Sequence, residues 1–319
     1  TRVIVVGHRN DIHLYRDLIR RGVSDYLIAP LGVLSVVKAI SDLYGTAEAA
    51  RLGRIIAVTG AKGGVGASTL AHNLAWSISQ RFDCNTVIVD LDLPFGTAGL
   101  DFNQDPPQGI AEAIYSPDRL DANFIDRLLS HCSDKLSLLA APALLDRTVD
   151  LGEDALDPIY DLLRQLVPVI VLDVPHGWQA WTRRALIAAD EVVVVAGPDL
   201  ASLRNTKNFV DVLRAARQND APPRVVLNQA GMPKRPEIAP GEFPKALKLE
   251  LSSVIPFDAQ LFGSASNNGQ MIAEIQAKGK VTELIGELAS VLTGRAVARR
   301  SGRGLLEPLM SKLIKLKAS

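Results

Sequence analysis

The chain has 319 residues, of which 47% are hydrophobic and 22% charged, and its formal net charge is zero at pH 7. This length allows about two domains with a sizeable core, and the composition is ordinary for an α/β protein. No apolar run reaches the roughly 18 residues of a membrane-spanning helix and no signal pattern is present, so we expect a cytoplasmic protein. Cys84 and Cys132 lack metal-ligand spacing, which favours isolated thiols.

Residues 1–45 show a β-α-β-α pattern. The expected strands cover residues 3–6 and 25–28, and the expected helices cover residues 11–21 and 33–44. The stretch 22–30, in which a glycine precedes a short strand and a proline, resembles the end of a response-regulator receiver domain. Ala29 stands where that family has lysine, and Gly7 where it has a switch Ser or Thr. We therefore expect the C-terminal half of an atypical receiver-like (flavodoxin-like) α/β domain used for docking, with an N-terminal extension of the main sheet as the alternative.

An alanine-rich linker, residues 46–53, leads to a domain expected over residues 54–293. Residues 54–59 form an apolar, β-branched run typical of a buried parallel strand, and apolar residues recur at helical spacing from Leu70 onward. A strand, a glycine-rich loop and a helix N-terminus form a phosphate cradle, because free N–H groups and the helix dipole face the anion. The residues expected to bind phosphate are Gly63, Gly64, Val65, Gly66, Ala67, Ser68 and Thr69.

The glycine-rich loop departs from the usual P-loop pattern at two positions. Ala61 replaces its first glycine, and Ala67 replaces its phosphate-binding lysine, whereas Ser68 keeps the hydroxyl that binds Mg²⁺. The Lys-Gly-Gly-Val-Gly of residues 62–66 resembles the deviant P-loop of the ParA/MinD superfamily. This resemblance implies ATP and Mg²⁺ as ligands and a mostly parallel, doubly wound P-loop NTPase sheet. It also implies a homodimer in which Lys62 touches the nucleotide of the partner subunit. A glycine-rich turn without a ligand is the alternative.

Two further strands end in carboxylates, at the edge where open α/β sheets bind ligands. Residues 86–92 end in Asp-Leu-Asp, and residues 169–173 end in Asp173. The second is a Walker B pattern, whose aspartate holds Mg²⁺ through water. The resemblance implies that Asp92 orients or activates the attacking water and that Asp90 supports the Mg²⁺ shell. Capping of the adjacent loop is the alternative for both.

The remaining elements follow from apolar periodicity. We expect loops and short helices over 103–133, a strand over 136–139, a helix over 154–166, a strand and turn over 191–198, and helices over 201–218 and 281–292. His176, in the turn after the Walker B strand, is expected to be a solvated loop residue rather than a catalytic group.

A strand over residues 224–228 ends in Asn228. The resemblance implies that Asn228 hydrogen-bonds the adenine base, with loop capping as the alternative. Residues 254–258 resemble the segment that closes over the base and lines the dimer interface in this superfamily. That likeness implies cofactor-binding roles for Pro256 and Asp258.

The C-terminal tail carries most of the basic excess. From Gly294 to the end, seven basic residues stand against Glu307 alone, so the tail has a net charge of +6 and the rest of the chain −6. Apolar residues interleave with the lysines there. A basic amphipathic helix suits a membrane surface or the groove of a partner, and packing on its own domain is the alternative. The acidic body argues against nucleic acid as a partner.

Within the superfamily, the loop Ala-Lys-Gly-Gly-Val-Gly-Ala-Ser-Thr behind a receiver-like segment resembles the CpaE/TadZ proteins. The resemblance implies a role in assembly or polar localisation of a Tad-type (Flp) pilus, with secretion proteins at the inner membrane as partners. Because Ala67 removes a charge-assisted phosphate contact, we expect ATP to drive dimerisation while its hydrolysis is slow or absent. An active ATPase that positions DNA or division machinery, and a scaffold that binds no nucleotide, are the alternatives.

Overall fold

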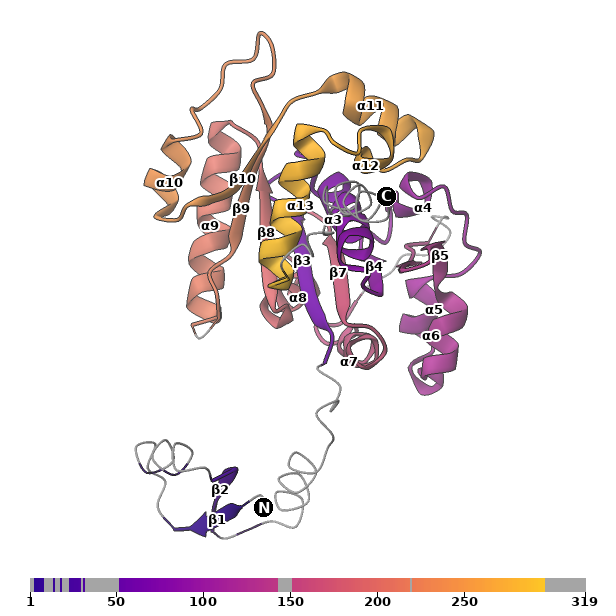
Figure 1. The fold of residues 1–319 in the computed structure, drawn as a ribbon, viewed down its shortest axis with the longest axis vertical. Coiled ribbons are helices and arrows are strands. Elements are labelled where there is room, and N and C mark those ends of the chain that lie inside the picture. The colour runs from indigo at the N-terminus through magenta and orange to yellow at the C-terminus, as the bar shows by residue number, and fades with distance from the viewer. Residues whose placement is uncertain are drawn as a thin grey trace, which may run out of the picture. The chain divides into compact units, whose positions relative to one another are not determined.

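The computed structural model describes residues 3–8, 14, 18, 23–29, 31, 52–142, 151–218 and 220–295. The chain divides into two compact units, Thr1–Arg51 and Leu52–Ser319 (Figure 1). Most of the expected linker and the expected tail beyond residue 295 lie outside the described residues.

In the first unit, two short strands form a parallel pair. They are β1 (Ile4–Gly7) and β2 (Asp25–Ile28), and Ile4 is in register with Asp25. Both strands were expected. The helices expected over 11–21 and 33–44 fall almost entirely outside the described residues, so the receiver-like assignment stays a prediction.

The second unit is built on an eight-stranded sheet with the order β10-β9-β8-β3-β7-β4-β6-β5. Every neighbouring pair is parallel except β5–β6. The strands are β3 (Arg54–Gly60), β4 (Thr86–Asp90), β5 (Ser130–Ser133), β6 (Leu136–Leu139), β7 (Val169–Val174), β8 (Glu191–Ala196), β9 (Arg224–Ala230) and β10 (Leu251–Pro256). The predicted mostly parallel, doubly wound α/β fold is confirmed.

Helices cover both faces of this sheet (Figure 1). They are α3 (Ala67–Phe82), α4 (Ala98–Asp101), α5 (Ile110–Tyr115), η1 (Pro117–Arg119), α6 (Ala122–Leu128), α7 (Asp157–Leu166), α8 (Ala180–Ala188), α9 (Leu200–Ala216), α10 (Glu242–Leu247), α11 (Ala259–Asn268), α12 (Ile272–Ile275) and α13 (Lys280–Thr293). Within the described part of the chain, none of them has the length and hydropathy that crossing a membrane requires.

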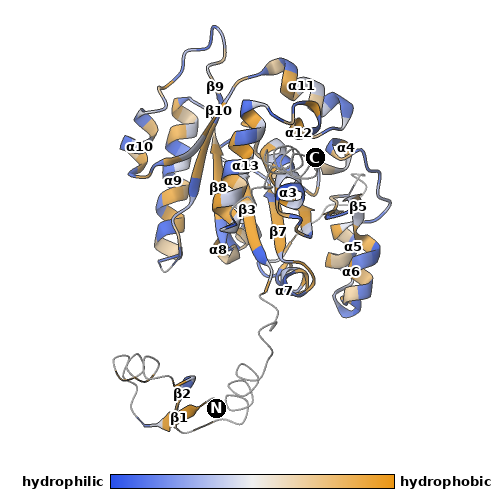
Figure 2. Ribbon diagram, viewed as in Figure 1, coloured by the Kyte–Doolittle hydropathy of each residue, from blue (hydrophilic) through white to orange (hydrophobic). Residues whose placement is uncertain are grey.

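Two hydrophobic cores result, one on each face. Side chains alternate along a strand, so Ile55 and Ala57 of β3 join the core under α5–α10, whereas Ile56 and Val58 join the core under α3, α4 and α11–α13. Figure 2 shows the central strands hydrophobic and the covering helices divided into hydrophobic and hydrophilic sides. The sheet is therefore buried on both sides, as parallel sheets usually are.

Some elements differ from expectation. Strand β5 lies within a region expected to contain only loops and short helices, because its Ser-His-Cys-Ser sequence carries no apolar alternation. Helix α8 was not expected after the turn at His176. Helix α7 begins at Asp157 rather than at residue 154, with Pro158 in its first turn, where proline is tolerated. Strand β9 continues to Ala230, so Asn228 lies inside it rather than at its end.

The parallel register brings the polar strand ends together. Asp90, the last residue of β4, pairs with Asp173 of β7, and Asp173 pairs with Val58 of β3, two residues before the end of that strand. The glycine-rich loop and both carboxylates thus meet at the carboxyl edge of the sheet, where ligands bind in open α/β folds.

Candidate functional site

A cavity of about 760 Å³ opens beside the loop that joins β3 to α3. All seven residues predicted to bind phosphate line it, together with Gly60 and Lys62: Gly63, Gly64, Val65, Gly66, Ala67, Ser68 and Thr69. The rest of the lining consists of residues 91–95 after β4, Leu151, and residues 174–176, Gln179 and Trp181 at and after the end of β7. Its volume lies in the range of about 300–1,000 Å³ that is typical of small-molecule sites.

The first turn of α3 presents backbone N–H groups to this cavity. Gly66 is the N-cap residue with φ 83°, a left-handed conformation that glycine adopts without strain. No described side chain caps the helix there. Uncapped N–H groups at the positive end of a 16-residue helix form an anion site. The loop and the helix N-terminus thus have the geometry that a phosphate cradle requires, and phosphate binding there stays a prediction.

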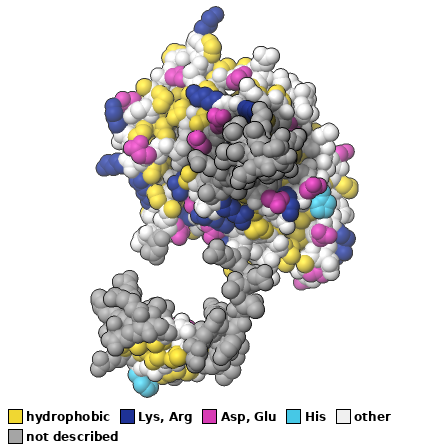
Figure 3. All heavy atoms as spheres, viewed as in Figure 1, with side chains coloured by type: hydrophobic (Ala, Val, Ile, Leu, Met, Phe, Trp, Pro, Cys, Tyr) yellow, Lys and Arg dark blue, Asp and Glu magenta, His cyan; other side chains and the backbone are white. Residues whose placement is uncertain are grey.

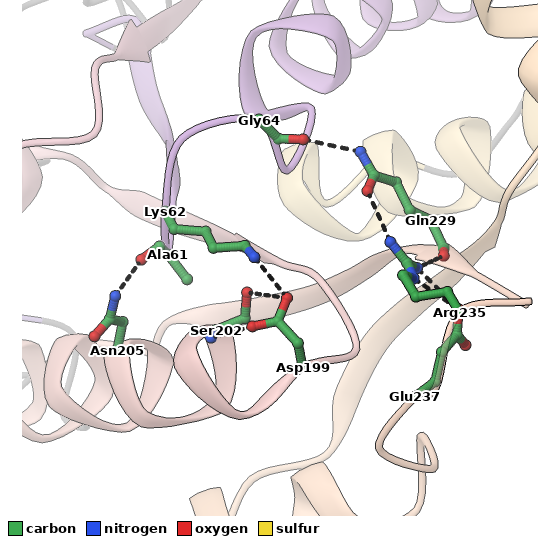
Figure 4. Close-up of polar contacts among 9 residues, drawn as sticks. All are labelled: Ala61, Lys62, Gly64, Asp199, Ser202, Asn205, Gln229, Arg235 and Glu237. Carbon is green, nitrogen blue, oxygen red and sulfur yellow. Dashed lines mark hydrogen bonds and ion pairs between the residues drawn. The ribbon is translucent and has the colours of Figure 1, made fainter. Parts of the chain in front are cut away.

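The end of β9 holds the loop from one side. Asn228 Nδ2 donates to Val65 O at 2.8 Å. Gln229 Nε2 donates to Gly64 O at 2.9 Å, as Figure 4 shows. Asn228 is 5% exposed, so its amide lies beneath the loop rather than on the cavity wall. In the structure Asn228 therefore holds the phosphate loop, and its contact with adenine stays a prediction.

Behind Gln229 lies a cluster that sequence reasoning missed. Gln229 has φ 58°, a left-handed conformation, and Arg235 donates to its carbonyl and to its side-chain Oε1. Glu237 accepts from the N–H groups of Gly231 and Met232. It also pairs with Arg235 (Figure 4). These hydrogen bonds lower the pKa of Glu237, and the bond from the Gly231 N–H has the largest effect. The cluster fixes Gln229 where it can hold the loop.

Helix α9 holds the loop from the other side. Lys62 Nζ lies 2.7 Å from Asp199 Oδ2, and Asn205 Nδ2 donates to Ala61 O at 2.8 Å (Figure 4). Partial burial would raise the pKa of Asp199, but the bonds from Lys62 and from the Ser202 N–H outweigh it and lower that pKa. The Lys62 side chain is 41% exposed. Such a pair is worth about 1 kcal/mol or less, so Lys62 can leave Asp199 at little cost.

The two buried carboxylates lie beneath the cavity rather than on its wall. Asp90 and Asp173 are 1% and 3% exposed. Asp90 accepts from the N–H groups of Asp92 and Ala98, at 3.0 and 3.1 Å. Burial, and then the negative charge of Asp173, raise the pKa of Asp90 to about 6. The capping alternative for Asp90 is thus seen, and its metal role stays a prediction.

Asp92 and His176 both reach the cavity. Asp92 accepts from the Phe95 N–H at 3.3 Å, and partial burial raises its pKa. His176 is exposed, as expected of a loop residue, but its Nδ1 lies 2.9 Å from Gly60 O. It therefore ties the turn after β7 to the end of β3.

A buried histidine is the main feature that sequence reasoning missed. His72 of α3 is 0% exposed, its Nδ1 lies 2.7 Å from Asp101 Oδ2, and its Nε2 lies 3.3 Å from Asp173 Oδ2. The second contact has ion-pair distance without the alignment of a hydrogen bond. Burial alone would lower the pKa of His72, but the two aspartates outweigh it and raise that pKa to about 10. The only sequence signal was a histidine on a helix with apolar faces.

The last two predicted residues lie away from the cavity wall. Pro256 ends β10 and pairs with Ala230, and Asp258 caps α11 by accepting from the Leu261 N–H at 2.9 Å. The structure therefore brings the loop, Lys62 and Asp92 together around one cavity. Asp90, Asp173 and Asn228 lie directly behind that wall, and the roles of Pro256 and Asp258 stay predictions.

A protein-family model described as an AAA domain matches residues 53–223. The septum site-determining protein MinD of Helicobacter pylori is 27% identical over 231 residues, which cover 68% of this chain and 83% of that protein. Its counterpart from Escherichia coli K12 is 25% identical over 252 residues, which cover 74% of this chain and 92% of that protein.

Solved structures show the same fold. A ParA family ATPase from Chlorobium tepidum superposes with a TM-score of 0.68 at 24% identity, covering 75% of this chain and 98% of that one. The cell division ATPase MinD of Pyrococcus furiosus superposes with a TM-score of 0.67 at 23% identity, covering 76% of this chain and 100% of that one.

Proposed function

Because the chain belongs to the AAA domain family, within the ParA/MinD superfamily of P-loop ATPases, we propose that it binds ATP with Mg²⁺ and dimerises through the bound nucleotide. In this proposal the ATP-bound dimer acts in the assembly or polar localisation of a Tad-type pilus, as in the CpaE/TadZ proteins. The observation that carries it is the loop over residues 62–69, which lines a cavity of about 760 Å³ with Lys62 exposed at its rim.

The residues around the cavity fit a magnesium nucleotide. Ser68 and Asp92 offer oxygen atoms at the wall, and Asp90 and Asp173 lie behind it, which is the all-oxygen donor set that Mg²⁺ prefers. Among the described residues no three His, Cys, Asp or Glu side chains form a metal site by themselves. The ion would be held by Ser68, by phosphate oxygens and by water that bridges to the aspartates. When bound, it neutralises charge on the phosphate oxygens.

Lys62 is the proposed link between subunits. Its side chain is exposed and is held by Asp199 at the start of α9. A second subunit that brings a nucleotide γ-phosphate to this face offers a stronger, doubly charged partner. ATP then favours the dimer because it makes contacts in the dimer that it lacks in the monomer. Hydrolysis is slow in this proposal because Ala67 leaves the phosphates without the usual lysine of their own loop.

The assignment to pilus assembly rests on the amino-acid sequence of the phosphate loop and on the receiver-like segment expected over residues 1–45. In this proposal the basic tail after Gly294 contacts lipid or secretion proteins. The protein is then cytoplasmic and associates peripherally with the inner membrane at one cell pole. The septum-positioning relatives support a second candidate, a MinD-like role in division. DNA positioning fits less well, because basic and acidic side chains are interspersed on the face drawn in Figure 3.

A deletion strain distinguishes the two candidates. We expect loss of the gene to abolish surface pili while leaving septa at midcell, and we expect a fluorescent fusion of the full chain to collect at one pole. Piliation is counted by electron microscopy and septum position by membrane staining. Restored piliation on complementation controls for polar effects on neighbouring genes. Normal piliation with misplaced septa would overturn the pilus role and favour the division role.

A further inference from the structure

His72 lies between two aspartates from different elements. Asp101 is the last residue of α4, and Asp173 belongs to β7, whereas His72 itself belongs to α3. The imidazole is fully buried, with Nδ1 2.7 Å from Asp101 and Nε2 3.3 Å from Asp173. The ring of Phe102, whose centroid is 5.6 Å away, packs beside it. One side chain therefore joins the helix after the phosphate loop to both neighbours.

The segment from Asp92 to Asp101 contacts two buried side chains, Asp90 and His72, at three points. Two are the N–H groups of Asp92 and Ala98, which donate to the two carboxylate oxygens of Asp90. The third is the carboxylate of Asp101, which lies on His72. Gly96, in the middle of the segment, passes so close to Asp90 that a Cβ would lie 2.4 Å from its Oδ2. The segment is thus in close contact with both Asp90 and His72.

The outer side of the same segment faces the candidate site. Residues 91–95 form one wall of the cavity, and Asp92 is among them. Asp173, at the other end of the histidine contact, directly precedes residues 174–176, which also line the cavity. The buried histidine thus contacts residues next to two parts of the cavity lining, the segment after β4 and the end of β7.

We propose that His72 is a positioning residue that couples Asp173 to the Asp92–Asp101 segment, so that a ligand bound near Asp173 sets the position of Asp92. The inference rests on the proposed nucleotide site and adds how two parts of its lining respond together. A merely structural histidine would stabilise the fold equally with and without ligand, whereas a coupling residue changes how the segment responds to ligand.

Amide hydrogen exchange of the full chain, with and without Mg-ATP, tests the coupling. In the wild type we expect ATP to slow exchange both in residues 60–69 and in residues 92–101. In Asp101→Asn, which keeps an acceptor but loses the charge, we expect the response of residues 60–69 to remain and that of residues 92–101 to fall by roughly half or more. The Kd of ATP should stay within about twofold of the wild-type value.

Two further variants keep the test decisive. His72→Gln removes the imidazole bridge from inside the cluster and is expected to reproduce the selective loss, which covers the case in which Asp101→Asn does not fold. Asp118→Asn, at an exposed carboxylate on η1, is the matched control and should respond as the wild type does. An undiminished response of residues 92–101 in both folded variants would overturn the coupling alone. No response at residues 60–69 in the wild type would overturn the nucleotide site and, with it, the coupling.

Discussion

Replacing Ala67 with lysine is expected to convert the chain into a faster ATPase that binds ATP more tightly. Ala67 lines the cavity at the position where the usual P-loop carries lysine. A hydrogen bond to a charged partner contributes about 1.5–3 kcal/mol, which corresponds to roughly tenfold to a hundredfold in affinity. A donor that acts on transition-state charge adds on the order of 10²–10³ in rate. Fluorescent ATP titration and phosphate release measure the two effects.

Ala67→Met is the matched control for this gain. Methionine has a similar length and flexibility but no charge, so it should change neither affinity nor rate by more than about threefold. Equal behaviour of the lysine and methionine variants would contradict the account, because the missing charge would then not be what slows hydrolysis.

Gly66→Val is expected to weaken ATP binding by on the order of tenfold to a hundredfold. Gly66 has φ 83°, and a Cβ there would lie 2.6 Å from Asn228 Nδ2, the amide that holds the loop. A left-handed conformation costs a non-glycine residue about 1–3 kcal/mol, most for a β-branched one, before the clash is counted. The loop must therefore leave the shape in which its N–H groups converge. Isothermal titration with Mg-ATP measures the loss.

Gly263→Ala controls for the general effect of losing a glycine. Gly263 lies in α11, where an added Cβ meets nothing within 4 Å, so alanine should be neutral or stabilising by up to about 1 kcal/mol. ATP binding by Gly66→Val at the wild-type affinity would show that the observed loop conformation is not the binding conformation.

The sequence predicted the part of the site that depends on local pattern. Three elements follow one another directly in the chain: the strand before the loop, the glycines, and the helix from Ala67. Their positions could therefore be predicted without tertiary information. The same holds for Asp90 and Asp173, because a short apolar strand that ends in a carboxylate places that carboxylate at a known edge of a parallel sheet.

The rest depends on contacts between residues far apart in the chain. His72 meets Asp101 and Asp173 only after α3 packs on the sheet, and nothing in its neighbourhood along the sequence signals two acidic partners. Lys62 likewise meets Asp199 only because β3 and β8 become neighbouring strands in the sheet. Strand β5 was missed because four polar residues at a sheet edge are fixed by pairing with β6 rather than by their own propensity.

ATP is expected to assemble the protein into a dimer through Lys62. The most direct measurement is the mass of the full chain in solution by light scattering, with and without Mg-ATP, for the wild type and for Lys62→Ala. The account predicts a monomer of 34.3 kDa that doubles in mass with ATP, and a variant that stays monomeric while it still binds ATP. A wild-type mass that ATP leaves unchanged, or a variant that dimerises as well as the wild type, would contradict it.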